Sequence, residues 1–133
     1  MQQILSDHNC EKQGRLLFRS LQRLGYSELI PMWLRMLPDV GLPFDADDES
    51  VWRLCQAQGI LLLTSNRRTV DGNSSLELTA RRLHNARTLP VVTIGDPERV
   101  VFDRAYCDSA AIALAEIVLD LENHRGNIRL YIP

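Results

Sequence analysis

The sequence predicts an α/β protein, a three-layer α/β/α sandwich around a mostly parallel central sheet. Two observations predict this class, and the chain length predicts the number of domains. Short apolar segments typical of strands alternate along the chain with longer segments of helical periodicity. The apolar run at residues 60–63 has no polar position, as expected for a strand buried on both faces of a parallel sheet. The chain of 133 residues has the length of one domain, which we expect to span residues 1–133.

The first strand and helix are predicted from residues 2–6 and from about residues 11–24. The strand is short and apolar, and the polar triplet that begins at Asp7 follows its carboxyl end. In the helical segment leucines recur at helical spacing, while arginines occupy the outward positions. Gly25 follows as the residue expected just beyond a helix C-terminus.

The next segments are a weaker strand, a loop and a second helix. Residues 28–34 predict a strand at a sheet edge, because a proline interrupts them and cannot donate to a sheet ladder. Residues 38–47 are rich in proline, glycine and aspartate and predict a loop. A helix at about residues 49–58 follows, and Asp47 or Asp48 is expected to cap it.

The second half of the chain continues the alternation of strands and helices. Its elements are expected, in order, as a strand at 60–64, a loop at 67–75, a helix at 74–85, a strand at 90–95, a short segment at 98–106, a helix at 108–123 and a strand at 129–132. Strands that alternate with helices in this way predict parallel pairing with right-handed crossovers.

The composition narrows the classes of function. The net charge is -2, so we expect no dedicated duplex-binding surface, although a local basic strip remains compatible with it. No apolar run approaches the ~20 residues of a membrane span, so we expect no membrane partner. Residues 1–7 lack the basic start and apolar run of an export signal. Together with three cysteines in no CxxC pair, this predicts a cytoplasmic protein with reduced thiols.

Several well-defined catalytic motifs do not occur in the sequence. It contains neither G-x-x-x-x-G-K-[ST] nor G-x-G-x-x-G, which argues against a P-loop NTPase and a dinucleotide-dependent oxidoreductase. It also contains neither G-x-S-x-G nor H-E-x-x-H, which argues against a serine hydrolase and a zincin. The three histidines are isolated from the cysteines, so a zinc site is not expected either.

Polar side chains follow several predicted strands at their carboxyl ends. Asp7 follows the first strand, residues 65–67 the third and Asp96 the fourth, while the acidic residues 45–49 lead into the second long helix. Ligands of open α/β sheets bind at this edge. Clustered carboxylates favour a hard divalent cation such as Mg²⁺ or Mn²⁺, which can activate water for phosphodiester hydrolysis. Capping of helices by the same aspartates is the alternative interpretation.

Five short motifs occur in an order that matches a known family. They are the triplet Asp7-His8-Asn9 at the end of the first strand, Leu24-Gly25-Tyr26 after the first helix, the pair Asp48-Glu49 at the start of the next helix, Gly59 with the apolar strand and residues 64–68 after it, and the strand at residues 89–92. In this order and spacing, residues 2–96 resemble the small PIN-like proteins related to the PIN-domain ribonucleases. Members of that family carry an Asp-Glu-Asn triplet, an Asp-Glu pair and Thr-x-Asp-x-Asp at these places.

The resemblance implies a divalent-metal-dependent endoribonuclease of the α/β/α class that uses Mg²⁺ or Mn²⁺. Carried over position by position, the metal ligands are Asp7, Asp48, Glu49 and Asn66, the catalytic residues are Asp7, Glu49 and Asn66, and Arg67 and Arg68 contact phosphate. Three positions depart from the family pattern. His8 replaces the acidic second residue of the triplet, Asn66 stands where the family has its next aspartate, and Arg68 stands where it often has another. Asp71 or Asp96 could compensate for the missing charge.

Two functions therefore follow from the resemblance. The first is an endoribonuclease with a partly degraded acidic site, of the kind found in toxin–antitoxin pairs. The second is a catalytically inactive PIN-like module that binds RNA or a protein partner. The expected partners are single-stranded RNA, an antitoxin-like protein and a second copy of the chain, paired through the edge strand at residues 129–132. A basic strip for RNA is expected from Arg67, Arg68, Arg81, Arg82 and Arg87.

Overall fold

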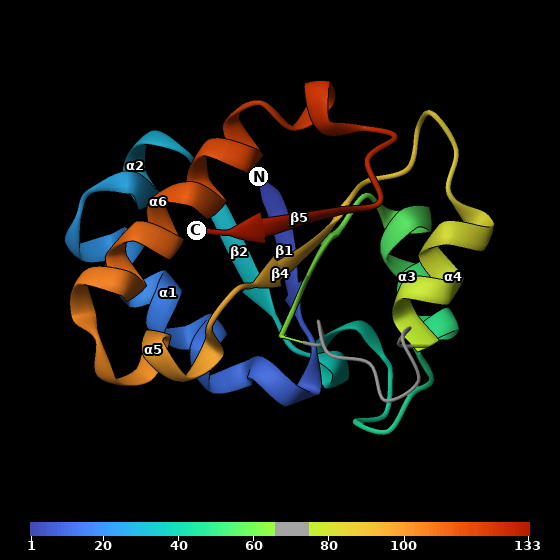
Figure 1. Ribbon diagram of the computed structural model, residues 1–133, viewed down its shortest axis with the longest axis horizontal. Helices are drawn as coiled ribbons and strands as arrows, with labels where there is room; N and C mark the ends of the chain where they lie inside the picture. The colour runs from blue at the N-terminus through green and yellow to red at the C-terminus, as the bar shows by residue number, and fades with distance from the viewer. Residues whose placement is uncertain (66–74) are drawn as a thin grey trace.

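The centre of the protein is a parallel β-sheet (Figure 1). The structure is a computed structural model that describes residues 1–65 and 75–133. The sheet strands are β1 (Gln2–Ser6), β2 (Met32–Arg35), β3 (Leu61–Thr64), β4 (Val91–Ile94) and β5 (Arg129–Ile132). In the described residues they form one sheet in the order β2-β1-β3-β4-β5, with every neighbouring pair parallel. This is one of the two common orders of doubly wound α/β sheets.

Helices cover both faces of the sheet, which confirms the predicted three-layer α/β/α class. One face carries α1 (Glu11–Arg23), α2 (Tyr26–Leu29), α5 (Pro97–Phe102) and α6 (Arg104–Leu119), and the other carries α3 (Asp48–Gln58) and α4 (Ser75–Leu83) (Figure 1). Short 3-10 turns occupy η1 (His8–Cys10), η2 (Leu37–Val40) and η3 (Leu121–His124). Helices on both faces are what parallel strands joined by crossover connections require.

Alternate residues of the strands supply two separate hydrophobic cores. Leu61 and Leu63 of β3 pack into the core under α1 and α6, whereas Leu62 packs into the core under α3 and α4. All of β3 is buried, because it lies inside the sheet with helices on both sides. A strand in this central position needs apolar side chains on both faces, which explains the uninterrupted apolar run in the sequence.

Three predicted elements differ from the observed ones. Residues 28–34 were expected to form one strand, but α2 occupies the first part and β2 starts only after Pro31. The Ile30 N–H closes a helical turn on the Tyr26 carbonyl at 2.8 Å, and Pro31 then ends the helical path. The segment at 98–106 contains helix α5. Helix α6 starts earlier than expected, because Asp103 caps it by accepting a hydrogen bond from the Tyr106 N–H at 3.1 Å.

The chain reverses its direction of travel across the sheet at β1. It passes from β1 to β2 on one side, then returns to β3 on the other side of β1. The carboxyl ends of β1 and β3 therefore flank the switch point, where ligands of open α/β sheets bind. This edge lies at the bottom of the view in Figure 1. Within the described residues, every helix is too short or too polar to cross a membrane.

Candidate functional site

Asp7 lies at the switch point, directly after β1. Its N–H donates to the Leu63 carbonyl at 2.9 Å, which extends the pairing of β1 with β3 by one residue. Its Oδ1 atom accepts a hydrogen bond from the His8 N–H at 2.8 Å, and its Oδ2 atom accepts one from Thr64 Oγ1 at 3.2 Å. The half-buried carboxylate is thus held between the ends of β1 and β3.

The Cys10 thiol is buried close to Asp7, between the ends of β1 and β3. Ser6 Oγ donates to the Cys10 carbonyl at 3.1 Å, and Cys10 Sγ lies 3.4 Å from the Leu63 carbonyl oxygen. Burial raises the pKa of Cys10 to about 12, so its thiol stays protonated at neutral pH. Burial, followed by the nearby charge of Asp7, raises the pKa of Cys55 to about 12 as well. Both cysteines are packing residues, because a protonated thiol is a poor nucleophile.

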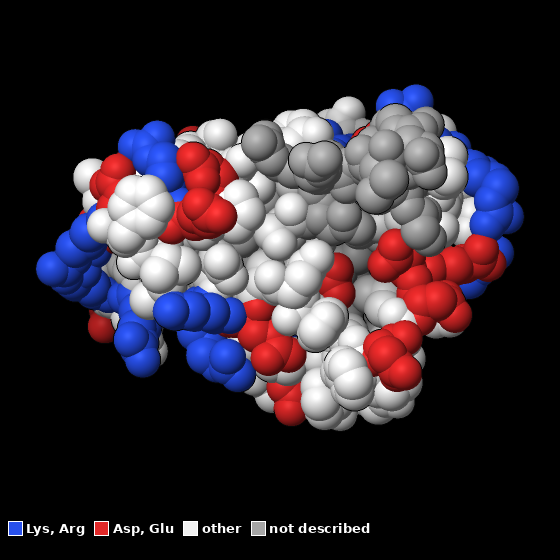
Figure 2. Space-filling model, turned by 60° about the horizontal axis from the view of Figure 1, so that its bottom comes forward, with Lys and Arg blue, Asp and Glu red and all other residues white. Residues whose placement is uncertain are grey.

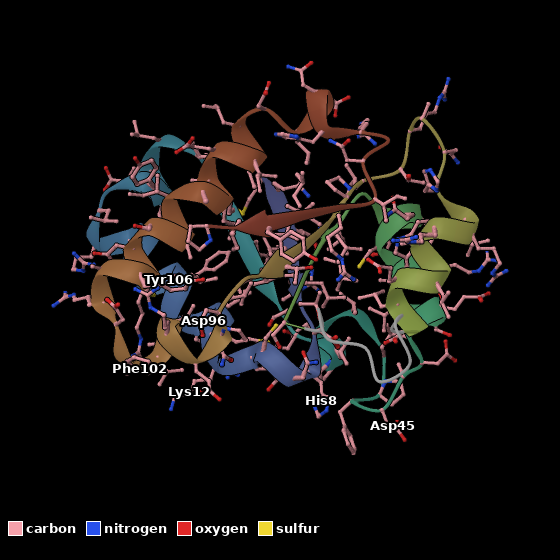
Figure 3. All side chains as sticks on the ribbon, viewed as in Figure 1. His8, Lys12, Asp45, Asp96, Phe102 and Tyr106 are labelled. Atoms are coloured by element: carbon pink, nitrogen blue, oxygen red, sulfur yellow. The ribbon has the colours of Figure 1, made fainter. Side chains whose placement is uncertain are left out.

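An exposed pair of rings stands beside Asp7. The centroids of the His8 and Phe44 rings are 5.7 Å apart and the ring planes are inclined by 60°. Phe44 comes from the loop before α3 and is 66% exposed. In Figure 3, His8 and the neighbouring Asp45 both lie on the lower edge, which is the carboxyl edge of the sheet. Phe44 escaped the sequence analysis, although a large apolar residue in a loop of prolines and aspartates is a usable signal.

The acidic residues at the start of α3 are engaged by other groups. Asp47 caps the helix by accepting from the Ser50 N–H at 2.7 Å, and this bond holds the pKa of Asp47 below its usual value. Glu49 Oε2 accepts from Arg53 Nε at 2.9 Å, and Glu49 Oε1 accepts from Arg82 Nη2 at 2.5 Å. The hydrogen bonds from Arg53 and Arg82 hold the pKa of Glu49 below its usual value. Glu49 therefore lines a pocket between α3 and α4, together with Arg53 and Arg82.

The predicted metal site depends on four residues, of which the structure describes three. Asp7 ends the first strand, while Asp48, half-buried, and Glu49 form the first turn of α3. Within residues 1–65 and 75–133, no three His, Cys, Asp or Glu side chains are arranged to hold a metal ion. Two guanidinium groups on Glu49 also repel a cation. Asn66 lies outside the described residues.

The predicted basic strip for RNA stays a prediction, because only part of it lies within the described residues. Arg67 and Arg68, like Asp71, lie outside the described residues. Arg81 lies 3.6 Å from Glu77, and Arg82 bonds Glu49, so both of these arginines are paired with acids. Figure 2 turns the carboxyl edge toward the reader and shows basic side chains at both its left and its right, with acidic side chains beside them.

Fold and site together define a doubly wound α/β protein with polar side chains at its switch point, the position where such sheets bind ligands in a crevice. The Asp7 carboxylate and the exposed His8 ring lie at this position, and the buried Thr64 hydroxyl group donates a hydrogen bond to the carboxylate. Comparison of the chain with models of protein families, with curated proteins and with solved structures finds no match in any of the three. Any functional assignment must therefore come from the residues themselves.

Proposed function

We propose that this protein is a PIN-like module that binds single-stranded RNA at the switch-point crevice. The observation that carries the proposal is the exposed His8–Phe44 ring pair beside the Asp7 carboxylate. Unpaired bases stack on aromatic rings and form hydrogen bonds with nearby polar groups. Binding without cleavage is favoured over cleavage, because each carboxylate oxygen of Glu49 already accepts a hydrogen bond from an arginine.

A binding titration with a short fluorescent single-stranded RNA tests this function. We expect wild-type protein to bind, and Phe44→Ala to weaken binding about tenfold, since stacking is worth about 1–3 kcal/mol per base. Leu119→Ala is the matched control, because Leu119 is 73% exposed and lies on α6, outside the crevice. Absence of RNA binding by wild type, or equal affinity of the Phe44 variant, would refute the proposal.

A metal-dependent endoribonuclease is the second candidate function. It is supported by the position of Asp7, a half-buried carboxylate at the one place in the sheet where ligands are expected. The proposed cation is Mg²⁺ or Mn²⁺, with Asp7 as the central ligand. Calorimetric titration of Mn²⁺ into wild type and Asp7→Asn, with RNA cleavage measured with and without EDTA, tests it. Binding lost in Asp7→Asn supports this function, and no binding at millimolar Mn²⁺ contradicts it.

A homodimer and a cytoplasmic location are proposed on separate grounds. β2 and β5 end the sheet of the described residues, and Tyr131 on β5 is 53% exposed. An open edge strand is able to pair with a second copy. Sedimentation velocity at several protein concentrations measures this association.

The buried free thiols Cys10, Cys55 and Cys107 fit a reducing compartment, and cell fractionation tests that location.

A further inference from the structure

A groove runs between α1 and the corner where α5 meets α6. Leu16 and Val100 lie in its apolar lining, and Phe102 of α5 stands on its wall. Phe102 is 73% exposed, which is unusual for a phenylalanine beside a hydrophobic floor. Arg19 from α1 and Arg104 from α6 are also among the residues that line the groove. An apolar floor with a ring and basic residues around it is a candidate binding surface.

A row of basic side chains extends along α1 from this groove. Lys12, Arg15 and Arg19 are three and four residues apart, so they lie along one side of the helix, with about 6 Å of rise between residues four apart. All three side chains belong to exposed residues. Within the part of the chain that the structure describes, these residues and Arg104 take part in no ion pair. We call Lys12, Arg15 and Arg19 the α1 stripe.

Acidic residues near the groove are already paired with arginines. Arg23 bonds Asp108, and this hydrogen bond holds the pKa of Asp108 below its usual value. Arg99 bonds Asp103 at 2.8 Å, which lowers the pKa of Asp103 in the same way. The Arg99 guanidinium also lies 4.4 Å from the ring centroid of Tyr106. These contacts hold α5 against α6 and α6 against α1. The α1 stripe takes no part in these ion pairs.

The α1 stripe leads to the crevice at the switch point. Gln13 Nε2 donates to the Pro97 carbonyl at 3.3 Å, which joins the start of α1 to the start of α5 at the carboxyl edge. Figure 3 shows Phe102, Lys12 and His8 in succession along that edge. Lys12 thus stands between the groove and the ring pair at the crevice.

We propose that the α1 stripe and Phe102 form the second half of a path for single-stranded RNA, with phosphates on the stripe and a base stacked on Phe102. This inference rests on the proposed function and extends it from the crevice to a longer segment of RNA. A row of cations that leads into a crevice matches a continuous polyanion, and an exposed ring supplies the stacking surface. An acidic protein segment is the competing ligand, and the experiments below distinguish it.

The first experiment compares RNAs of about 4 and about 12 nucleotides, a range covered by single-strand binding modules. We expect wild type to bind the longer RNA at least tenfold more tightly. The double variant Arg15→Gln/Arg19→Gln loses that gain. It also loses two phosphate contacts, each of which contributes about 0.7 to the slope of log affinity against log salt, so the magnitude of this slope falls by about 1.4. The matched control is Arg53→Gln/Arg125→Gln, two exposed arginines outside the α1 stripe, and it keeps the gain. All variants are first compared by circular dichroism and thermal melting.

The second experiment separates stacking from apolar burial at one position. Phe102→Trp keeps the affinity for the longer RNA, whereas Phe102→Leu lowers it about fivefold or more, because leucine has no π-face. Equal losses in both variants, or binding of a poly-glutamate peptide that competes with RNA, would overturn the proposed path in favour of a protein ligand.

The length comparison also separates this inference from the proposed function. If wild type binds both RNAs equally, the path is refuted while the crevice function stands. If the Arg53/Arg125 control loses the length gain and the α1 variant keeps it, the path is refuted as well. If neither RNA binds, both proposals fail.

Discussion

Thr64 Oγ1 donates a hydrogen bond to Asp7 Oδ2 across 3.2 Å, and this bond joins the carboxyl ends of two neighbouring strands at the switch point. The Thr64 side chain is completely buried. Water therefore does not compete for the Thr64 hydroxyl group. The stability of the crevice and the position of its acid depend on the same bond.

Replacement of Thr64 by valine should destabilise the fold by about 1–2 kcal/mol, because it removes a donor to a carboxylate at nearly constant shape. Urea unfolding measures the change. Thr64→Ser retains the hydroxyl group and should keep the interaction with Asp7. A double-mutant cycle of Thr64→Val and Asp7→Ala should give an interaction free energy of about 1 kcal/mol. A coupling energy near zero would mean that the bond contributes nothing to stability.

Gly14 allows α1 to approach β1 closely. A Cβ atom at Gly14 would lie 3.0 Å from Ser6 Oγ and 3.3 Å from Ser6 Cβ. Ser6 cannot easily yield, because it is buried and bonded to the Cys10 carbonyl at 3.1 Å. We expect Gly14→Ala to destabilise the protein by about 1 kcal/mol, since overpacking costs about 1–3 kcal/mol against a gain of about 1 in helix propensity.

The same position offers an internal control. In a Ser6→Ala background the Oγ atom is gone, so Gly14→Ala should cost less than it does in the wild-type background. Urea unfolding of the four proteins gives both values. A Gly14→Ala protein more stable than wild type would show that the helix shifts without penalty.

The ion pairs of Glu49 should make stability depend on pH. The pKa of Glu49 is below its ordinary value because of the bonds from Arg53 and Arg82. Its contribution is therefore fully present above the pKa of the unfolded chain, and it is lost as the pH falls through the lower pKa of the folded protein. The difference in melting temperature between wild type and Glu49→Gln should be largest near neutral pH and disappear in acid.

Salt provides the control for this prediction. Glu49 and both arginines are largely exposed, so the difference should shrink at high ionic strength. Arg82→Gln added to Glu49→Gln should change the melting temperature little further. A difference that persists unchanged in acid would contradict the ion-pair explanation.

The cysteines should be nearly inert in the native protein. Cys10 and Cys55 are completely buried with pKa values of about 12, and Cys107 is 5% exposed. We expect negligible reaction with a thiol reagent at mildly alkaline pH and release of three thiols on denaturation. Peptide mass spectrometry on partly labelled protein should find Cys107 first. Prior labelling of Cys10 would show that the floor of the crevice opens in solution.

Much of the fold could be predicted because its signals are local. The apolar run that became β3 and the helical spacing in α1 depend on neighbouring residues only. The segment around Pro31 was less predictable, since a turn of helix and a strand compete within a few residues there. The position of Asp7 at the carboxyl edge of the sheet could be predicted, because all parallel strands end at the same edge. The remaining candidate site depends on contacts that no local pattern encodes.

The sequence by itself determined the alternation of strands and helices and placed Asp7 after the first strand, because hydrophobic periodicity acts over a few residues. Only the tertiary structure decided the strand order, and with it the switch point between β1 and β3. It also decided that Glu49 meets Arg82, 33 positions away, and that Phe44 lies against His8. Such pairings depend on how distant segments pack, since charge and stacking act through distances in space.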